Sequence, residues 1–103
     1  MSTISKAFKT FMTEAPSHAK AWGEMVQELS SANTLEPKTS ALAYLAVLAA
    51  LNHTSGVPFH VLSAKEAGAS REEIISAILI GLPAAGHIVT QSLPIAQDTY
   101  DRE

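Results

Sequence analysis

The chain has 103 residues, a length suited to one domain, and we expect residues 1–103 to form a single domain. Only 17% of the residues are charged, against about a quarter in an average protein, which favours a buried interface between subunits. The net charge is −3 and the basic residues are scattered, which excludes a nucleic-acid partner. The absence of cysteine excludes disulfides, thiolate catalysis and cysteine-based zinc sites.

The sequence also lacks the signals of secretion and membrane insertion. The first residues have no apolar segment of the kind found in signal peptides. The longest apolar run, residues 41–51, is too short to cross a bilayer, which needs about 20 residues. We therefore expect a cytoplasmic protein with no membrane partner.

Two amphipathic helices are predicted in the N-terminal third. The first covers residues 2–13 and ends before Pro16, because proline disfavours helical geometry in the preceding residue. The second covers residues 17–31, and we expect Trp22 to anchor it in the core. Apolar side chains recur at helical spacing in both segments: Ile4, Ala7, Phe8 and Phe11, then Ala21, Trp22, Met25, Val26 and Leu29.

A third helix is predicted over residues 37–52, with Pro37 in its first turn. Apolar residues surround this helix, so we expect it to be buried on every side. Because a chain this short can hardly enclose such a helix alone, we expect a second subunit to help cover it.

The C-terminal half continues with helices. A fourth helix is predicted over residues 58–68, where Gly68 suits the left-handed position that follows a helix end. Ser70 and Glu73 form a capping-box pattern, which predicts the start of a fifth helix.

Prolines divide the last third of the chain. Pro83 interrupts the fifth helix, and a further helical stretch over residues 84–100 is bent or split at Pro94. Residues 98–103 are polar and are expected to fray. Since no segment alternates apolar and polar residues as a strand does, the predicted fold class is all-α, with about six helices.

Histidines are the main candidates for chemistry. His53 and His60 flank a turn and could face the same pocket, whereas the commoner roles are for His53 to cap the end of the third helix and for His60 to bond a backbone carbonyl. His87 follows a run of small residues and is either a pocket wall or part of tight helix packing. His18 lies among polar neighbours and is expected on the surface.

Hydroxyl groups supply further pocket candidates. Tyr44 could act as an acid in a buried pocket, although a buried tyrosine bonded to a neighbour is commoner. Ser55 could act as a nucleophile beside His60, but nothing in the spacing demonstrates an orienting group. No metal and no cofactor are expected, because the histidines and carboxylates do not follow any common metal-ligand spacing.

Several segments together resemble the AhpD-like, or carboxymuconolactone decarboxylase, family. The pattern comprises His60 and the helix after it, the Ala-Gly-Ala-Ser connection at residues 67–70, and the Glu-Glu-Ile start of the next helix. Ala15-Pro16, Leu35 with Lys38, and residues 77–84 agree in order and spacing, so the resemblance covers roughly residues 8–95.

The resemblance implies that this chain lacks most of the catalytic groups of the peroxidase-type members. Peroxidase-type members carry two cysteines and a glutamate beside the histidine, and the corresponding positions here are His53, Gly56 and Ala41, with His60 retained. Thiol peroxidase activity is excluded, because disulfide cycling requires thiolates. The decarboxylase branch acts on a carboxylated lactone, but the two arginines, Arg71 and Arg102, lie far in sequence from the histidines.

Two classes of function follow from the resemblance. The first is a cofactor-free decarboxylase or lactone-handling enzyme, with His60 as general acid or base, His53 assisting, and a small carboxylated molecule as substrate. The second is a non-catalytic binding or assembly protein on the same scaffold. The family is typically a homotrimer or a hexamer, so the expected protein partner is the chain itself, with a pocket between the third helix, the fourth helix and the Gly86–His87 segment.

Overall fold

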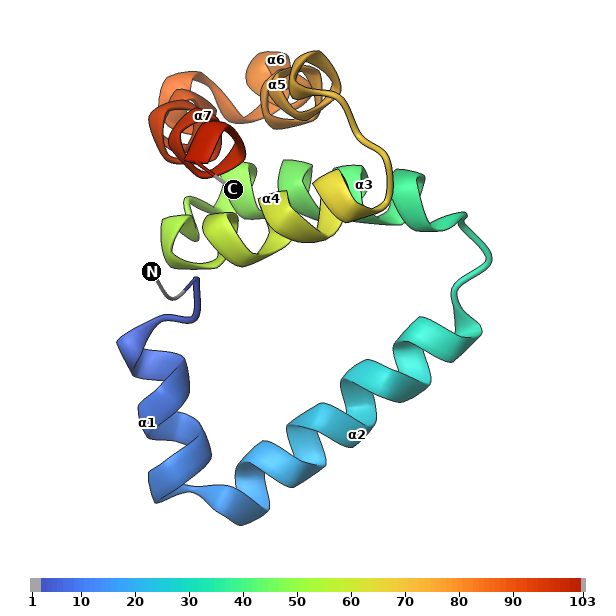
Figure 1. The fold of residues 1–103 in the computed structure, drawn as a ribbon, viewed down its shortest axis with the longest axis vertical. Coiled ribbons are helices and arrows are strands. Elements are labelled where there is room, and N and C mark those ends of the chain that lie inside the picture. Colours follow the sequence, from blue (N-terminus) through green and yellow to red (C-terminus); the bar gives the residue numbers. More distant parts are fainter. Residues whose placement is uncertain (1–2, 103) are drawn as a thin grey trace. The chain divides into compact units, whose positions relative to one another are not determined.

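The structure is a computed structural model that describes residues 3–102, all of which lie in helices or in the connections between them (Figure 1). The all-α prediction is confirmed. Two compact units are distinguished, Met1–Leu35 and Glu36–Glu103. Six helices have nine or more residues: α1 (Lys6–Glu14), α2 (Pro16–Ala32), α3 (Pro37–Leu51), α4 (Val57–Glu66), α5 (Arg71–Leu79) and α7 (Ser92–Arg102). The single turn α6 (Leu82–Ala85) and two 3-10 segments, η1 (Thr54–Gly56) and η2 (His87–Gln91), complete the order.

The first unit consists of α1 and α2. Ser5 caps α1 by accepting the Phe8 N–H at 3.1 Å, and the predicted start of this helix at Ser2 lies outside the described residues. The chain leaves α1 at Ala15, whose N–H bonds to the Phe11 carbonyl, and Pro16 opens α2. Proline fits that position because the first turn of a helix has no use for its missing N–H.

Trp22 does not anchor a core, so that prediction was wrong. Its side chain is 44% exposed, and its ring packs edge-on against Phe8 at 5.3 Å and Phe11 at 6.3 Å between centroids. Neither α1 nor α2 contains a buried residue. Trp22 therefore packs into an aromatic cluster on the surface of a unit whose two helices have no buried core.

The hydrophobic core lies in the second unit. There α3 packs against α4 and α5, while α7 packs against α4 and α5 (Figure 1). The side chains that fill the space between these helices are aliphatic and almost completely buried: Leu45, Leu48, Ala49, Val57, Val61, Ala64, Ala69, Ile74, Ile78, Val89 and Ala96. Each large aliphatic side chain that is fully buried contributes about 1.5–3 kcal/mol.

Within this unit helix α3 is buried on one side only, so the chain does not enclose the helix by itself, and burial of the other side by a second subunit stays a prediction. Leu45 and Leu48 lie in the core, whereas Val47 and Leu51 are more than half exposed and Tyr44 is 48% exposed. The neighbouring helices α4 and α5 cover one side of α3, and the opposite side keeps its apolar side chains without cover from this unit.

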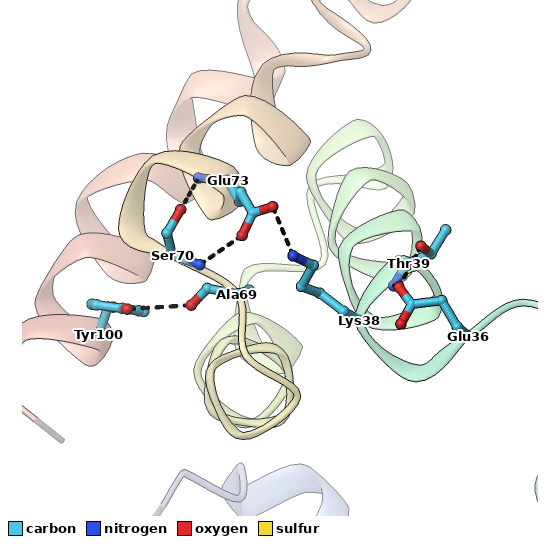
Figure 2. A network of polar contacts seen from close by, with 7 residues as sticks. All are labelled: Glu36, Lys38, Thr39, Ala69, Ser70, Glu73 and Tyr100. Carbon is cyan, nitrogen blue, oxygen red and sulfur yellow. Dashed lines mark hydrogen bonds and ion pairs between the residues drawn. The ribbon is translucent and has the colours of Figure 1, made fainter.

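The helix ends follow the predicted signals. Gly68 has φ +97°, a left-handed conformation open to glycine, and it follows the end of α4 as predicted. Ser70 accepts the Glu73 N–H while Glu73 accepts the Ser70 N–H, so the capping box that starts α5 is confirmed (Figure 2).

The last third differs from the prediction in where it breaks. Gly86, with φ +81°, separates α6 from η2, whereas Pro94 lies in the first turn of α7, where a proline is tolerated. The predicted fraying of residues 98–103 was also wrong for the described part. Asp101 pairs with Arg71, which holds the end of α7 against α5, and Glu103 lies outside the described residues.

Candidate functional site

Tyr44 of α3 and His60 of α4 lie ring against ring, with centroids 4.4 Å apart and planes tilted by 43°. Phe59 touches the same imidazole edge-on at 5.2 Å. The chain brings these rings together because Asn52 takes the left-handed conformation at the end of α3, and η1 then leads directly into α4. The sequence singled out both Tyr44 and His60 but did not predict that they are partners.

Gly56 lies close to both Leu48 and the imidazole of His60. A Cβ atom built at this position would lie 3.5 Å from Leu48 Cδ2 and 4.0 Å from His60 Cδ2, which are ordinary contact distances. The backbone of Gly56 has φ −87° and ψ −13°, which other residues also adopt. A side chain at position 56 would therefore begin against Leu48, at the limit of contact with the imidazole of His60.

The imidazole of His60 is half-buried and has no hydrogen-bond partner among residues 3–102, so the predicted bond to a backbone carbonyl is not formed. Burial lowers the pKa of His60 below its ordinary value of 6.5, because desolvation disfavours the charged ring. His60 is therefore neutral at pH 7, with one ring nitrogen able to accept a proton and the other able to donate one.

The other predicted site residues lie on the surface. His53, Ser55 and His87 are exposed. The His53 side chain does not cap a helix, and in the described part of the chain neither ring contact nor hydrogen bond joins it to His60. His87 begins η2, and its carbonyl accepts the Thr90 hydroxyl. Their participation in a shared site stays a prediction.

A sequence profile of the carboxymuconolactone decarboxylase family matches residues 16–98. The chain belongs to this family. No curated protein and no solved structure matches it. The matched residues include Tyr44, Gly56 and His60, so the whole ring arrangement falls within the part of the chain that the family shares.

In this carboxymuconolactone decarboxylase family member, the position expected to correspond to the peroxidase glutamate is Ala41, whose methyl group cannot transfer a proton. Ala41 is partly buried and packs against the core. The positions expected to correspond to the two cysteines are His53, which is exposed, and Gly56, which has no side chain. The correspondence of His60 to the histidine of the peroxidase relay stays a prediction from the resemblance.

The lysine and arginine side chains of residues 36–102 pair with groups other than the imidazole of His60. Lys38 pairs with Glu73 at 3.0 Å, and Lys65 donates to the Tyr100 carbonyl at 2.8 Å while its ammonium lies over the Tyr100 ring. The two arginines pair with acidic residues of α7: Arg71 with Asp101 and Arg102 with Asp98. The site around His60 is therefore aromatic and apolar in character.

A shallow hollow lies on α2, where polar side chains line it: Glu24, Gln27, Glu28 and Ser31. It includes none of the predicted site residues. In residues 3–102 no three histidine, aspartate or glutamate side chains are grouped closely enough to hold a metal ion. Nor does any helix in this range combine the length and apolar character required to traverse a bilayer.

Proposed function

We propose that this family member is a cofactor-free enzyme that acts on a small lactone and uses His60 to transfer a proton. The observation that supports this proposal is the state of the imidazole: it is half-buried, burial lowers its pKa, and neither ring nitrogen is hydrogen-bonded within the described residues. A histidine with a pKa near the working pH is an effective general acid or base.

The reaction suggested by the family is a decarboxylation. The carboxylate of the substrate leaves as carbon dioxide when its carbon–carbon bond breaks, and the electron pair stays on the ring carbon. That carbon then takes a proton from the protonated form of His60, which is the minor form at pH 7, and the neutral imidazole is protonated again by hydronium from the solvent. An imidazole can complete both proton transfers without a thiol.

The carboxylate of such a substrate would bind without a spare cation from residues 36–102. Lys38, Lys65, Arg71 and Arg102 each have a partner, so none of them is spare as a clamp. A neutral lactone of the same ring therefore belongs in the assay beside the carboxylated one. The contribution of His53 as a helper of His60 is proposed on its proximity in sequence alone.

The test is turnover on a panel of carboxylated and neutral lactones. We expect the wild-type chain to convert at least one, and His60→Ala to lose at least about 100-fold in rate while keeping its helical content, as expected when a general acid or base is removed. His18→Ala, an exposed histidine on α2, is the matched control and should keep full activity. His53→Ala and His87→Ala then show whether either contributes. Absence of turnover by the wild type across the panel would overturn the proposal.

A second candidate is a non-catalytic assembly or binding protein. Exposed apolar side chains favour it, namely Tyr44, Val47, Leu51 and Phe59 on α3 and α4. We propose that the chain assembles with itself as a homotrimer or a hexamer, because an apolar stripe of this kind is stabilised by a partner subunit. Mass measurement in solution tests the assembly. A fixed oligomer without any turnover favours this candidate over the enzyme.

A further inference from the structure

We infer that Tyr44 is a positioning residue for His60: its ring orients the imidazole, and its hydroxyl takes no part in proton transfer. This inference rests on the proposed role of His60. It assigns to Tyr44 a task different from that of a buried acid, because the Tyr44 side chain is 48% exposed.

The argument begins with what orients a histidine. A catalytic imidazole is usually held by a hydrogen bond from one ring nitrogen to a carboxylate or a carbonyl. His60 has no such bond among the described residues. The contacts that restrict its ring are therefore aromatic: Tyr44 at 4.4 Å and Phe59 at 5.2 Å.

Of these two rings, Tyr44 supplies the independent constraint. Phe59 is the neighbour of His60 on α4, so the two side chains share one backbone. Tyr44 belongs to α3, one helical turn before the buried Leu48, which ties this part of α3 to the core. The Tyr44 ring therefore holds the imidazole relative to a second helix.

The hydroxyl of Tyr44 is not needed for this task. Nothing in residues 3–102 accepts or donates a hydrogen bond to it. The chain's other tyrosine, Tyr100, provides a contrast, since its hydroxyl donates to the Ala69 carbonyl at 3.2 Å (Figure 2). Tyr100 is held by a hydrogen bond from its hydroxyl, whereas Tyr44 contacts His60 through its ring.

Charged groups do not account for the environment of His60. On the elements packed against α4, Lys38 pairs with Glu73, Arg71 with Asp101 and Arg102 with Asp98. On α4 itself Lys65 turns to Tyr100, and Glu66 is exposed. Burial is the one cause that lowers the pKa of His60, and the Tyr44 ring contributes to that burial.

The experiment compares Tyr44→Phe, which keeps the ring, with Tyr44→Leu, which removes it. The imidazole proton signals of His60 are followed by NMR as a function of pH. We expect Tyr44→Phe to leave the pKa of His60 and its contacts to ring 44 unchanged. Tyr44→Leu should raise that pKa toward 6.5, because solvent then reaches the imidazole. Tyr100→Phe is the matched control and should leave the titration of His60 unchanged.

These readouts need no turnover, so a failure here is distinct from a failure of the proposed enzyme activity. With an active substrate, Tyr44→Phe should keep kcat, whereas Tyr44→Leu should lower kcat and shift the pH profile. An unchanged titration in Tyr44→Leu would overturn the inference. So would an equal loss of kcat in both variants, which would assign the role to the hydroxyl. Circular dichroism of both variants checks folding.

Discussion

Lys38 of α3 and Glu73 of α5 form an ion pair at 3.0 Å, and the same carboxylate accepts the Ser70 N–H at 2.9 Å (Figure 2). One side chain thus starts α5 and joins it to α3. Arg71 and Asp101 join α5 to α7 in a similar way, through two nitrogens and two oxygens. The beginning of α5 is therefore tied to both of the helices beside it.

Ser70→Ala removes the hydroxyl that accepts the Glu73 N–H. We expect the free energy of unfolding to fall by about 1 kcal/mol, the usual cost of losing an N-cap side chain. Urea denaturation measures the change. Ser76→Ala, at an exposed position within α5, is the matched control and should be neutral or slightly stabilising. Equal losses in the two variants would contradict a specific role for the cap.

Acid should destabilise the protein through its capping and paired carboxylates. The Ser70 N–H, with help from Lys38, lowers the pKa of Glu73 below 4.5, and Arg71 lowers that of Asp101 below 3.8. The unfolded chain therefore takes up these protons first as the pH falls. The stability that these two carboxylates contribute should be complete above about pH 4.5–5 and decline as the pH passes downward through the lowered pKa values. Urea midpoints between pH 6 and pH 3 test this, and Glu73→Gln should show a shallower decline.

His60 should add a separate decline at higher pH. Because burial lowers its pKa below 6.5, the unfolded chain binds a proton at His60 before the folded chain does. Stability due to this group is therefore present above about pH 6.5 and is lost as the pH falls toward the lowered pKa. Urea midpoints between pH 8 and pH 5 should fall less in His60→Gln than in the wild type. Indistinguishable profiles would show that the imidazole is as well solvated when folded as when unfolded.

Ser92 is completely buried, and its hydroxyl has no hydrogen-bond partner in the described part of the chain. Ser92→Ala should stabilise the protein by about 1 kcal/mol, because it removes a buried polar atom that lacks a partner. Thermal unfolding measures the gain. Ser55→Ala, at an exposed serine, should change the stability by less than about 0.5 kcal/mol. A loss of stability in Ser92→Ala would indicate that water or another group satisfies the hydroxyl.

The two faces of α3 should respond differently to truncation. Leu45→Ala opens a cavity in the core and should cost about 2–5 kcal/mol. Leu51→Ala, at a side chain that is 63% exposed, should cost less than about 0.5 kcal/mol when the protein is measured at low concentration. A large cost that grows with protein concentration would instead show that another subunit covers Leu51.

Local signals predicted the helices well because each depends on a few neighbouring residues. Pro16 and Pro37 open helices, Gly68 follows the end of one, and Ser70 and Glu73 start the next. The break at Gly86 was misplaced to Pro94, since a proline in the first turn of a helix and one in its middle look alike in sequence. The positive φ of Gly86 marks the actual break in the chain, and the sequence alone does not show it.

The candidate site was harder to predict because it depends on which faces of two helices meet. Spacing alone suggested that the histidines converge, yet the structure brings Tyr44 to His60. Tyr44 and Leu48 are four residues apart on one face of α3, and Gly56 and His60 are four residues apart at the start of α4. Because Gly56 lies beside both Leu48 and His60, this shared spacing is a signal that could have paired Tyr44 with His60. Trp22 was misjudged for a related reason, since amphipathic spacing identifies an apolar face but not what covers it.

A single substitution at Gly56 would place a side chain beside the imidazole of His60 and so change the environment that sets its reactivity. Any side chain introduced there would start between Leu48 and the imidazole, since its first carbon would lie 3.5 Å from Leu48 Cδ2 and 4.0 Å from His60 Cδ2. A hydroxyl, an amide or a carboxylate at that point would give the ring its first polar neighbour. Position 56 is therefore where natural variants of this scaffold, or an engineer, would most directly retune its acid–base behaviour.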